Sequence, residues 1–163
     1  MVAKIRPCLW FNGNAEDAAR FYAETFPDSR IDKVWHAPDD YPAGEKGDAL
    51  LVEATILGMP FMLLNGGPEF RFDEAVSFVV ATDDQAETDR YWAAIVANGG
   101  EESVCGWCKD RFGLSWQITP TRLTDLMSEG GERGRRAFQA MMQMRKIDIA
   151  ALDAAVEGVS ADA

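Results

Sequence analysis

The sequence predicts an α+β fold in which two βαβββ modules form curved mixed sheets around a cavity, followed by a C-terminal helical extension. The first observation is a repeat, because one strand, one amphipathic helix and three further strands occur twice along the chain. The second is the change to helix-forming residues after Pro120. Corresponding helix positions lie 70 residues apart and corresponding turn glycines 55 apart: Asn14 and Asp84, Phe21 and Tyr91, Tyr22 and Trp92, Gly58 and Gly113.

The composition indicates one sizeable core and an acidic surface. The chain has 163 residues, of which 47% are hydrophobic, and its formal net charge is -11. This charge repels phosphate backbones and anionic lipids, so we expect neither a nucleic-acid nor a membrane partner. Three cysteines, no apolar signal segment and no run long enough to cross a bilayer fit a cytoplasmic location.

The first module is predicted to start with a strand over 4–11 that leaves through a turn into a helix. Asn14 is a suitable N-cap for this helix, and Pro27 ends it. The rest of the module is predicted to be a strand over 29–36, a long loop over 37–47, and a hairpin with strands over 48–56 and 59–65.

The second module repeats this order. We expect a strand over 76–81, a helix capped by Asp83 or Asp84 and ended by 98–100, a hairpin of strands 103–105 and 107–109 around Gly106, a turn over 110–113 and a strand over 115–119. The last strand alternates, with Ser115, Gln117 and Thr119 on one face and Trp116 and Ile118 on the other. The polar face either lines a cavity or faces solvent, and this segment alone leaves both interpretations open.

The extension is predicted to form helices over 121–127 and 132–144 and a last helix from Asp148, its N-cap. Ile147 and Leu152 stand where a hydrophobic staple would dock this helix. The methionines of the extension suit packing on the same chain or on a second subunit, and we favour a homodimer. Residues 158–163 are expected to fray.

Several motifs together resemble the PhnB-like branch of the vicinal oxygen chelate superfamily, which has the glyoxalase/bleomycin resistance/dioxygenase fold. Members of this branch often carry the label 3-demethylubiquinone-9 3-methyltransferase. The resemblance covers almost the whole chain, tail included, and implies a domain over 1–120, with modules at about 4–66 and 75–120, and an extension over 121–157. The motifs that carry it are the segments 7–11, 21–22, 26–29, 64–68, 105–107 and 109–117.

The resemblance implies where a metal site would lie, because metal-dependent members use side chains of the first and fourth strands of each module. Carried onto this chain, these positions are Pro7, Met62, Ser77 and Gln117. Only Gln117 could coordinate, and one neutral amide does not hold a divalent ion that needs three or four donors. We therefore expect no metal at the standard position and no cofactor.

The remaining soft donors form no clear zinc site. Cys105 and Cys108 have C-x-x-C spacing, but a single such pair is a weak signal, and we favour two free thiols flanking a tight hairpin. A reversible disulfide, a reactive thiol or a metal site with Cys8 and His36 are the alternatives. His36, the only histidine, and Cys8 are the candidate catalytic residues.

The candidate ligand-binding residues combine aromatic surface, polar strand positions and a cation that could attract an anionic group of a substrate. They are Trp10, Phe61, Asn65, Ser77, Trp107, Arg111 and Gln117.

The leading functional hypothesis is a protein that binds a small apolar or aromatic molecule in its cavity without the standard metal. The alternatives are a lyase, isomerase or dioxygenase, metal-dependent or using His36 or Cys8, and a partner-binding module that works through the methionine-rich tail. The methyltransferase label receives no support, because the sequence lacks the glycine-rich turn of common S-adenosylmethionine enzymes.

Overall fold

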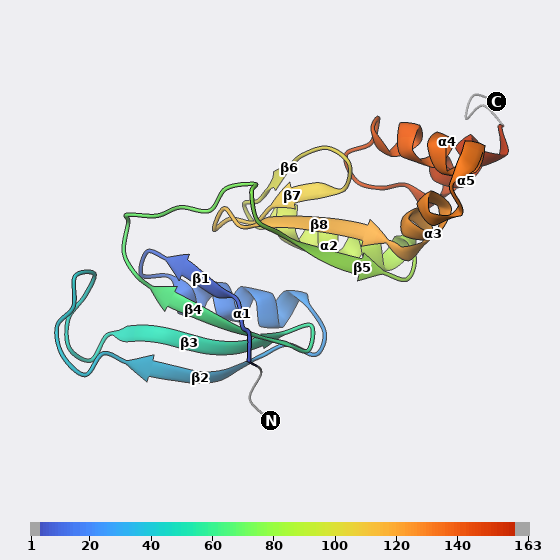
Figure 1. Cartoon of the computed structure of the whole chain (residues 1–163). Helices are drawn as coiled ribbons and strands as arrows, with labels where there is room; N and C mark the ends of the chain where they lie inside the picture. The colour runs from blue at the N-terminus through green and yellow to red at the C-terminus, as the bar shows by residue number, and fades with distance from the viewer. Residues whose placement is uncertain (1–3, 159–163) are drawn as a thin grey trace. The chain divides into compact units, whose positions relative to one another are not determined.

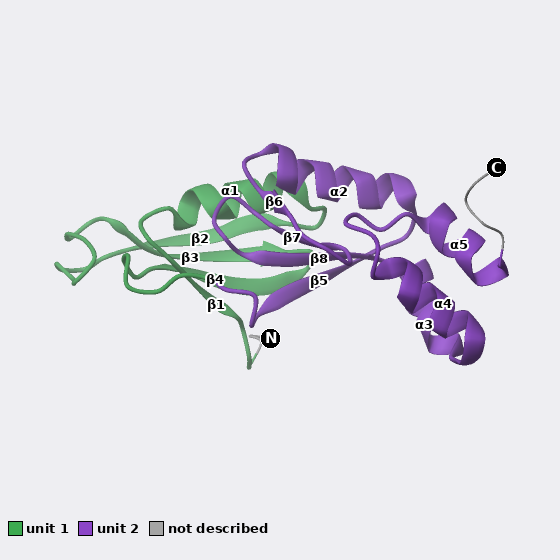
Figure 2. Ribbon diagram, turned by 90° about the horizontal axis from the view of Figure 1, so that it is seen from above, with its two compact units in different colours: residues 1–72 green, residues 73–163 purple. Residues whose placement is uncertain are grey.

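The computed structural model describes residues 4–158 and contains two compact units, residues 1–72 and 73–163 (Figure 2). Each unit has one four-stranded mixed sheet, and three further helices follow the second sheet (Figure 1). The predicted α+β class, the two βαβββ modules and the C-terminal helices are therefore confirmed. Among the described residues, no helix is long and apolar enough to span a bilayer.

The first unit contains β1 (Cys8–Phe11), α1 (Ala15–Thr25), β2 (Arg30–His36), β3 (Ala49–Ile56) and β4 (Met59–Asn65). The sheet order is β1-β4-β3-β2, with β1 parallel to β4 and the other pairs antiparallel. α1 packs against β2, β3 and β4 (Figure 2). Alternate strand residues, among them Leu9, Phe11, Val52, Leu63 and Phe61, are buried on the side of this helix.

The start of α1 differs from the prediction. Asn14 occupies the N-cap position, but its side chain makes no capping hydrogen bond. Instead, the Ala15 amide donates to Oδ1 of Asn65 over 2.9 Å. A side chain from the end of β4 thus satisfies one of the free amides of the helix N-terminus, which ties α1 to the sheet.

The second unit repeats the arrangement with β5 (Ser77–Thr82), α2 (Gln85–Ala97), β6 (Glu101–Glu102), β7 (Trp107–Lys109) and β8 (Ser115–Pro120). The order is β5-β8-β7-β6, with β5 parallel to β8. Asp84 caps α2 by accepting a hydrogen bond from the Glu87 amide over 2.8 Å, as predicted.

The strand predicted over 103–105 is wrong. The pairing strand is β6, and residues 103–106 form the turn that follows it. Cys105 and Gly106 both have positive φ angles, 58° and 83°, which an extended strand excludes. The hairpin around Gly106 therefore has a wider turn and a shorter first arm than the sequence pattern indicates.

The extension consists of α3 (Thr121–Glu129), α4 (Gly131–Met141) and α5 (Ile149–Glu157). Asp148 caps α5 by accepting from the Ala151 amide over 2.9 Å, and Ile147 and Leu152 are fully buried in one cluster, which confirms the predicted docking of this helix. Met141 and Met144 pack against the same cluster, whereas Met142 is exposed. Of the end predicted to fray, residues 159–163 lie outside the described residues.

Candidate functional site

Each sheet has an open face, defined here as the face opposite its helix. In the second unit, α2 covers Phe78, Val80, Trp116 and Ile118. The side chains that alternate with them form the open face: Ser77, Val79, Ala81, Trp107, Lys109, Ser115, Gln117 and Thr119. Gln117 and Thr119 are half-buried, while Val79 and Ala81 are exposed.

Ser77 and Gln117, both predicted to bind a ligand, lie together on this face. The Gln117 side-chain amide donates to Oγ of Ser77 over 2.9 Å. Val79 and Trp107 are the register neighbours of Gln117 on the two adjoining strands. The open face of the second sheet therefore combines a hydrogen-bonded polar pair with aromatic and aliphatic surface.

A pocket of about 130 Å³ lies beside this pair, towards the edge of the sheet. Its walls are Glu74, Glu101, Glu102, Ser103, Trp107, Cys108, Lys109 and Ser115. Lys109 Nζ forms an ion pair with Glu74 Oε1 at 2.5 Å. Ser115 is only 1% exposed, and its Oγ has no hydrogen-bond partner. A buried hydroxyl without a partner is uncommon in proteins and calls for an explanation.

The Asp110 turn holds the strands that form this pocket. Asp110 is buried, and its Oδ1 accepts from the amides of Phe112 at 2.9 Å and Leu114 at 3.1 Å. Its Oδ2 accepts a hydrogen bond from Trp116 Nε1 at 2.9 Å. Trp116 lies on the face of the sheet that α2 covers. Arg111, a predicted ligand residue, lies in this turn between β7 and β8. Its guanidinium carbon is 5.0 Å from the centroid of the Phe112 ring.

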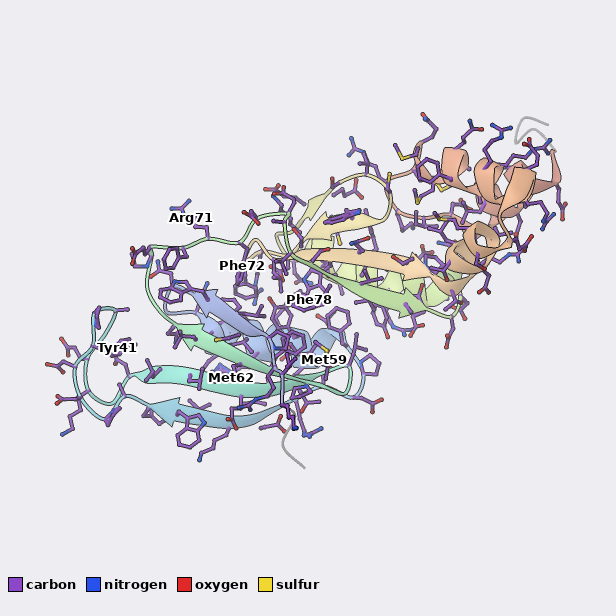
Figure 3. The ribbon with its side chains drawn as sticks, in the orientation of Figure 1. Tyr41, Met59, Met62, Arg71, Phe72 and Phe78 are labelled. Carbon is purple, nitrogen blue, oxygen red and sulfur yellow. The ribbon has the colours of Figure 1, made fainter. Side chains whose placement is uncertain are left out.

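The open face of the first unit combines apolar side chains with an ion pair, because Glu53, the register partner of Met62, pairs with Arg6 at 3.3 Å. Cys8 and Met62 are register partners on it, followed by the pair Trp10 and Leu64. Met62 is labelled on β4 in Figure 3. The first-strand metal position was predicted at Pro7, and this assignment is wrong by one residue. Leu9 is buried on the helix side, so its neighbour Cys8 faces the open side and Pro7 does not. A slip of one residue along a strand exchanges its two faces.

The segment after β4 covers Trp10. The Trp10 indole Nε1 donates to the Gly67 carbonyl over 2.9 Å, and its ring meets Phe70 edge-on at 5.0 Å between centroids. A Cβ atom at Gly66 would overlap the indole ring, so only glycine fits there without movement. Trp10 is thus held in place by its own module.

The other two ligand candidates of the first unit lie on the opposite side of the sheet. Phe61 is buried against α1 with 3% of its surface exposed. Asn65 caps α1 through Oδ1, and its side-chain amide donates to the Ala49 carbonyl over 2.8 Å. Both side chains make contacts that hold the module together.

The cysteines are free thiols. Desolvation, followed by the nearby carboxylates of Asp110 and Glu102, raises the pKa of buried Cys108 to about 12. Cys105 Sγ lies 3.7 Å from Met142 Sδ. Partial desolvation also raises the pKa of Cys8, which keeps its thiol protonated near neutral pH.

His36 Nδ1 lies 3.0 Å from the Gly47 carbonyl, at the exposed end of β2. Within residues 4–158 there is no group of three or more His, Cys, Asp or Glu side chains arranged to hold a metal ion. With Cys8 in place of Pro7, the standard positions of the first unit offer a thiol and the Met62 thioether, and those of the second unit offer the Ser77 hydroxyl and the Gln117 amide. In neither unit do these neutral groups supply the ligands that a hard divalent cation needs.

Comparisons with known proteins agree with this architecture. The model of the family described as 3-demethylubiquinone-9 3-methyltransferase matches residues 3–119. The match ends before α3, so the resemblance expected over the tail stays a prediction. None of the curated proteins matches significantly.

Solved structures show the same fold. A putative 3-demethylubiquinone-9 3-methyltransferase, PhnB protein, from Bacillus cereus is 28% identical with a TM-score of 0.65, over 72% of this chain and 99% of its own. Protein PA1353 from Pseudomonas aeruginosa is 21% identical with a TM-score of 0.60, over 73% and 98%. A glyoxylase/bleomycin resistance protein/dioxygenase domain from Frankia sp. EAN1pec is matched over 74% and 92%, at 11% identity and a TM-score of 0.46, a likeness too weak to bear on function.

Proposed function

This chain belongs to the family described as 3-demethylubiquinone-9 3-methyltransferase, of the PhnB-like type, and we propose that it binds a small apolar or aromatic molecule on the open face of its second sheet. Binding needs no metal ion at the standard position of the fold. The observation that carries the proposal is the pocket with the unpartnered, buried Oγ of Ser115 on its wall, because a polar group of a ligand in this pocket would give the hydroxyl a hydrogen-bond partner.

The size of the pocket indicates that it holds only one end of a ligand, while the rest of the ligand lies on the open face beside it. A volume of about 130 Å³ is smaller than the roughly 300–1,000 Å³ of pockets that enclose a whole drug-sized ligand. It therefore suits one polar end of a molecule. The remainder would lie over Trp107 and Val79, and Val79 is 61% exposed. Exposed aliphatic surface beside an aromatic wall favours an apolar or aromatic body.

The available groups favour binding over catalysis. The side chains at the standard metal positions, Cys8, Met62, Ser77 and Gln117, are neutral, so a metal-dependent lyase, isomerase or dioxygenase reaction lacks the charged or imidazole ligands it needs there. Cys8 is held in the weakly nucleophilic thiol form by its raised pKa. His36 bonds to a loop carbonyl at the exposed end of a strand. The methyltransferase in the family name is likewise not matched by a glycine-rich cofactor turn in this sequence.

The test is direct binding of neutral probes to the full chain. Indole, toluene and octanol would be titrated by saturation-transfer difference NMR and by thermal unfolding, in which a ligand of the native state raises the melting temperature. Val79→Asp places a charge on the open face and should weaken binding by about tenfold or more. Val104→Asp is the matched control, because Val104 is similarly exposed, at 57% against 61%, but lies in the turn after β6 and not on the open face of the sheet.

The proposal fails if no neutral probe binds saturably, or if both aspartate variants bind like the wild type. Elemental analysis of untagged protein prepared without chelator tests the metal-free part separately. A stoichiometric transition metal would contradict it and direct attention to the enzyme alternative.

A further inference from the structure

The residues that line the pocket of the second sheet determine which polar group of a ligand fits there. The register places four open-face residues in one row across the sheet: Ser77, Ser115, Lys109 and Glu101. Ser115 and Lys109 are directly opposed on neighbouring strands. Opposed residues have Cβ atoms about 4.5–5.5 Å apart, so the charged group nearest to the unpartnered hydroxyl along the row is the lysine.

Three residues of this row, Ser77, Ser115 and Lys109, carry hydrogen-bond donors. Ser77 Oγ accepts the Gln117 amide proton, which leaves its own hydroxyl proton available to donate. Ser115 has an available hydroxyl, and Lys109 carries three N–H donors. An oxygen acceptor placed between Ser115 and Lys109 would receive hydrogen bonds from both.

Three glutamates line the pocket together with Lys109, but none of them bonds to the Ser115 hydroxyl. Glu74 pairs with Lys109 at 2.5 Å, yet its side chain is 63% exposed. Glu101 is exposed at the far side of Lys109 in the row. Glu102 is engaged elsewhere, by Trp92 Nε1 at 3.0 Å and by Arg145 at 3.4 Å. None of these carboxylates bonds to Ser115, which stays unpartnered.

We infer that the pocket binds an oxyanion of the ligand, such as a carboxylate, which takes the place of Glu74 on Lys109 and accepts a hydrogen bond from Ser115. The inference rests on the proposed function and names the polar group of the same ligand. Glu74 is a replaceable partner, because an exposed ion pair contributes little and is easily exchanged for another anion. The ligand oxyanion gains a second, buried donor that Glu74 does not reach.

The test uses three probes with one ring and different head groups: benzoate, benzamide and benzylammonium. In the wild-type chain, benzoate should bind about tenfold or more tightly than benzamide, because hydrogen bonds to an ionised acceptor are about twice as strong as neutral ones. Benzylammonium should not bind saturably. Affinities are measured by ligand-observed NMR at fixed, low ionic strength, since the contribution of the lysine is screened by salt.

Three variants assign the effect to the named groups. Ser115→Ala and Lys109→Gln should each weaken benzoate binding by about tenfold. Glu74→Gln should strengthen it by up to about fivefold, the range that corresponds to losing an exposed competing ion pair. A gain in affinity cannot come from misfolding. Thr119→Ala is the control, because Thr119 lies on the same strand and face but outside the pocket walls.

Each outcome decides the matter. Tighter binding of benzylammonium than of benzoate, or equal benzoate affinity for the Ser115→Ala and Thr119→Ala variants, overturns the oxyanion inference. If indole or toluene still binds and Val79→Asp still weakens that binding, the proposed function stands without the inference. If none of the charged or neutral probes binds, both fall.

Discussion

Replacing Ser115 with alanine should stabilise the ligand-free protein, although the residue lies deep in the second unit. Ser115 is 1% exposed, and its Oγ has no partner. Leaving a buried hydroxyl unsatisfied costs about 1–3 kcal/mol, and alanine removes that atom while keeping Cβ. We therefore expect the free energy of unfolding to rise by about 1 kcal/mol. For a chain of this size that corresponds to roughly 2–4 °C in melting temperature.

A buried hydroxyl that has partners provides the contrast. Thr88 Oγ1 donates to the Asp84 carbonyl over 2.8 Å and lies 2.6 Å from Thr82 Oγ1. Thr88→Val keeps the side-chain shape but breaks both contacts and leaves Thr82 unsatisfied. This variant should lose about 1–3 kcal/mol. Both substitutions are in the same unit, so opposite signs cannot come from a general effect of removing a hydroxyl.

The assay is urea unfolding of the full chain, followed by circular dichroism and by tryptophan fluorescence, with coincidence of the two transitions as the check for two-state behaviour. The wild type and both variants are compared without any ligand and again with benzoate. Benzoate should raise the midpoint of the wild type and have a much smaller effect on Ser115→Ala. A destabilised, ligand-free Ser115→Ala protein would refute the reasoning, because it would mean that the hydroxyl is already satisfied.

Further expectations concern other parts of the chain. Gly66→Ala should destabilise by about 1–3 kcal/mol through overlap with the Trp10 ring, and the loss should shrink in a Trp10→Ala background, which unfolding of the double mutant would measure. Asp110→Ala removes the acceptor of three hydrogen bonds and should cost at least about 3 kcal/mol by urea unfolding, whereas an unchanged midpoint would contradict the role of the turn. Cys108, with a pKa of about 12, should resist iodoacetamide in the native protein at pH 8 and react after unfolding, as followed by mass spectrometry. Hydrogen bonds from Arg135 and Arg136 lower the pKa of Glu132 to about 2, so its stabilising contribution is present above its ordinary pKa of 4.5 and lost as the pH falls towards 2; an NMR titration midpoint near 4.5 would contradict this.

The sequence was sufficient for the order of elements because periodicity and turn residues are local signals. The caps at Asp84 and Asp148 and the docking of Ile147 and Leu152 follow from short spacings and are confirmed. The cap of α1 could not be predicted, because its acceptor, Asn65, lies 50 positions further along the chain. Contacts that depend on sheet register are visible only once the sheet is formed.

The same limit applies to the candidate site. Alternation predicted that Ser115 and Gln117 share a face, yet the unpartnered state of Ser115 depends on β7 lying beside β8 in one register. The role proposed for Lys109 in binding an oxyanion depends on its position directly across from Ser115 in that register. Pro7 was predicted to lie on the open face, where the structure has Cys8. The offset of 70 residues between the two modules, which the helices show, differs by one residue between the first strands of the modules.

The C-terminal helices bear on the pocket although the family match ends before them. Two backbone amides in the turn after β6 form hydrogen bonds with the extension and not with a strand. The Cys105 amide donates to the Met144 carbonyl at 2.8 Å, and the Gly106 amide donates to the Arg145 carbonyl at 2.7 Å. Two ion pairs, Arg145 with Glu102 and Lys146 with Asp89, hold the same segment against the unit.

Trp107 and Lys109 follow this turn directly, so the segment that fixes the turn also fixes where β7 places its side chains. A relative that ends near residue 119 must satisfy the two turn amides with solvent or with other groups. The extension therefore stabilises the edge of the sheet that carries the pocket walls. Under the proposed function, this chain and a relative without the extension can differ in ligand choice even where the residues that touch the ligand are the same.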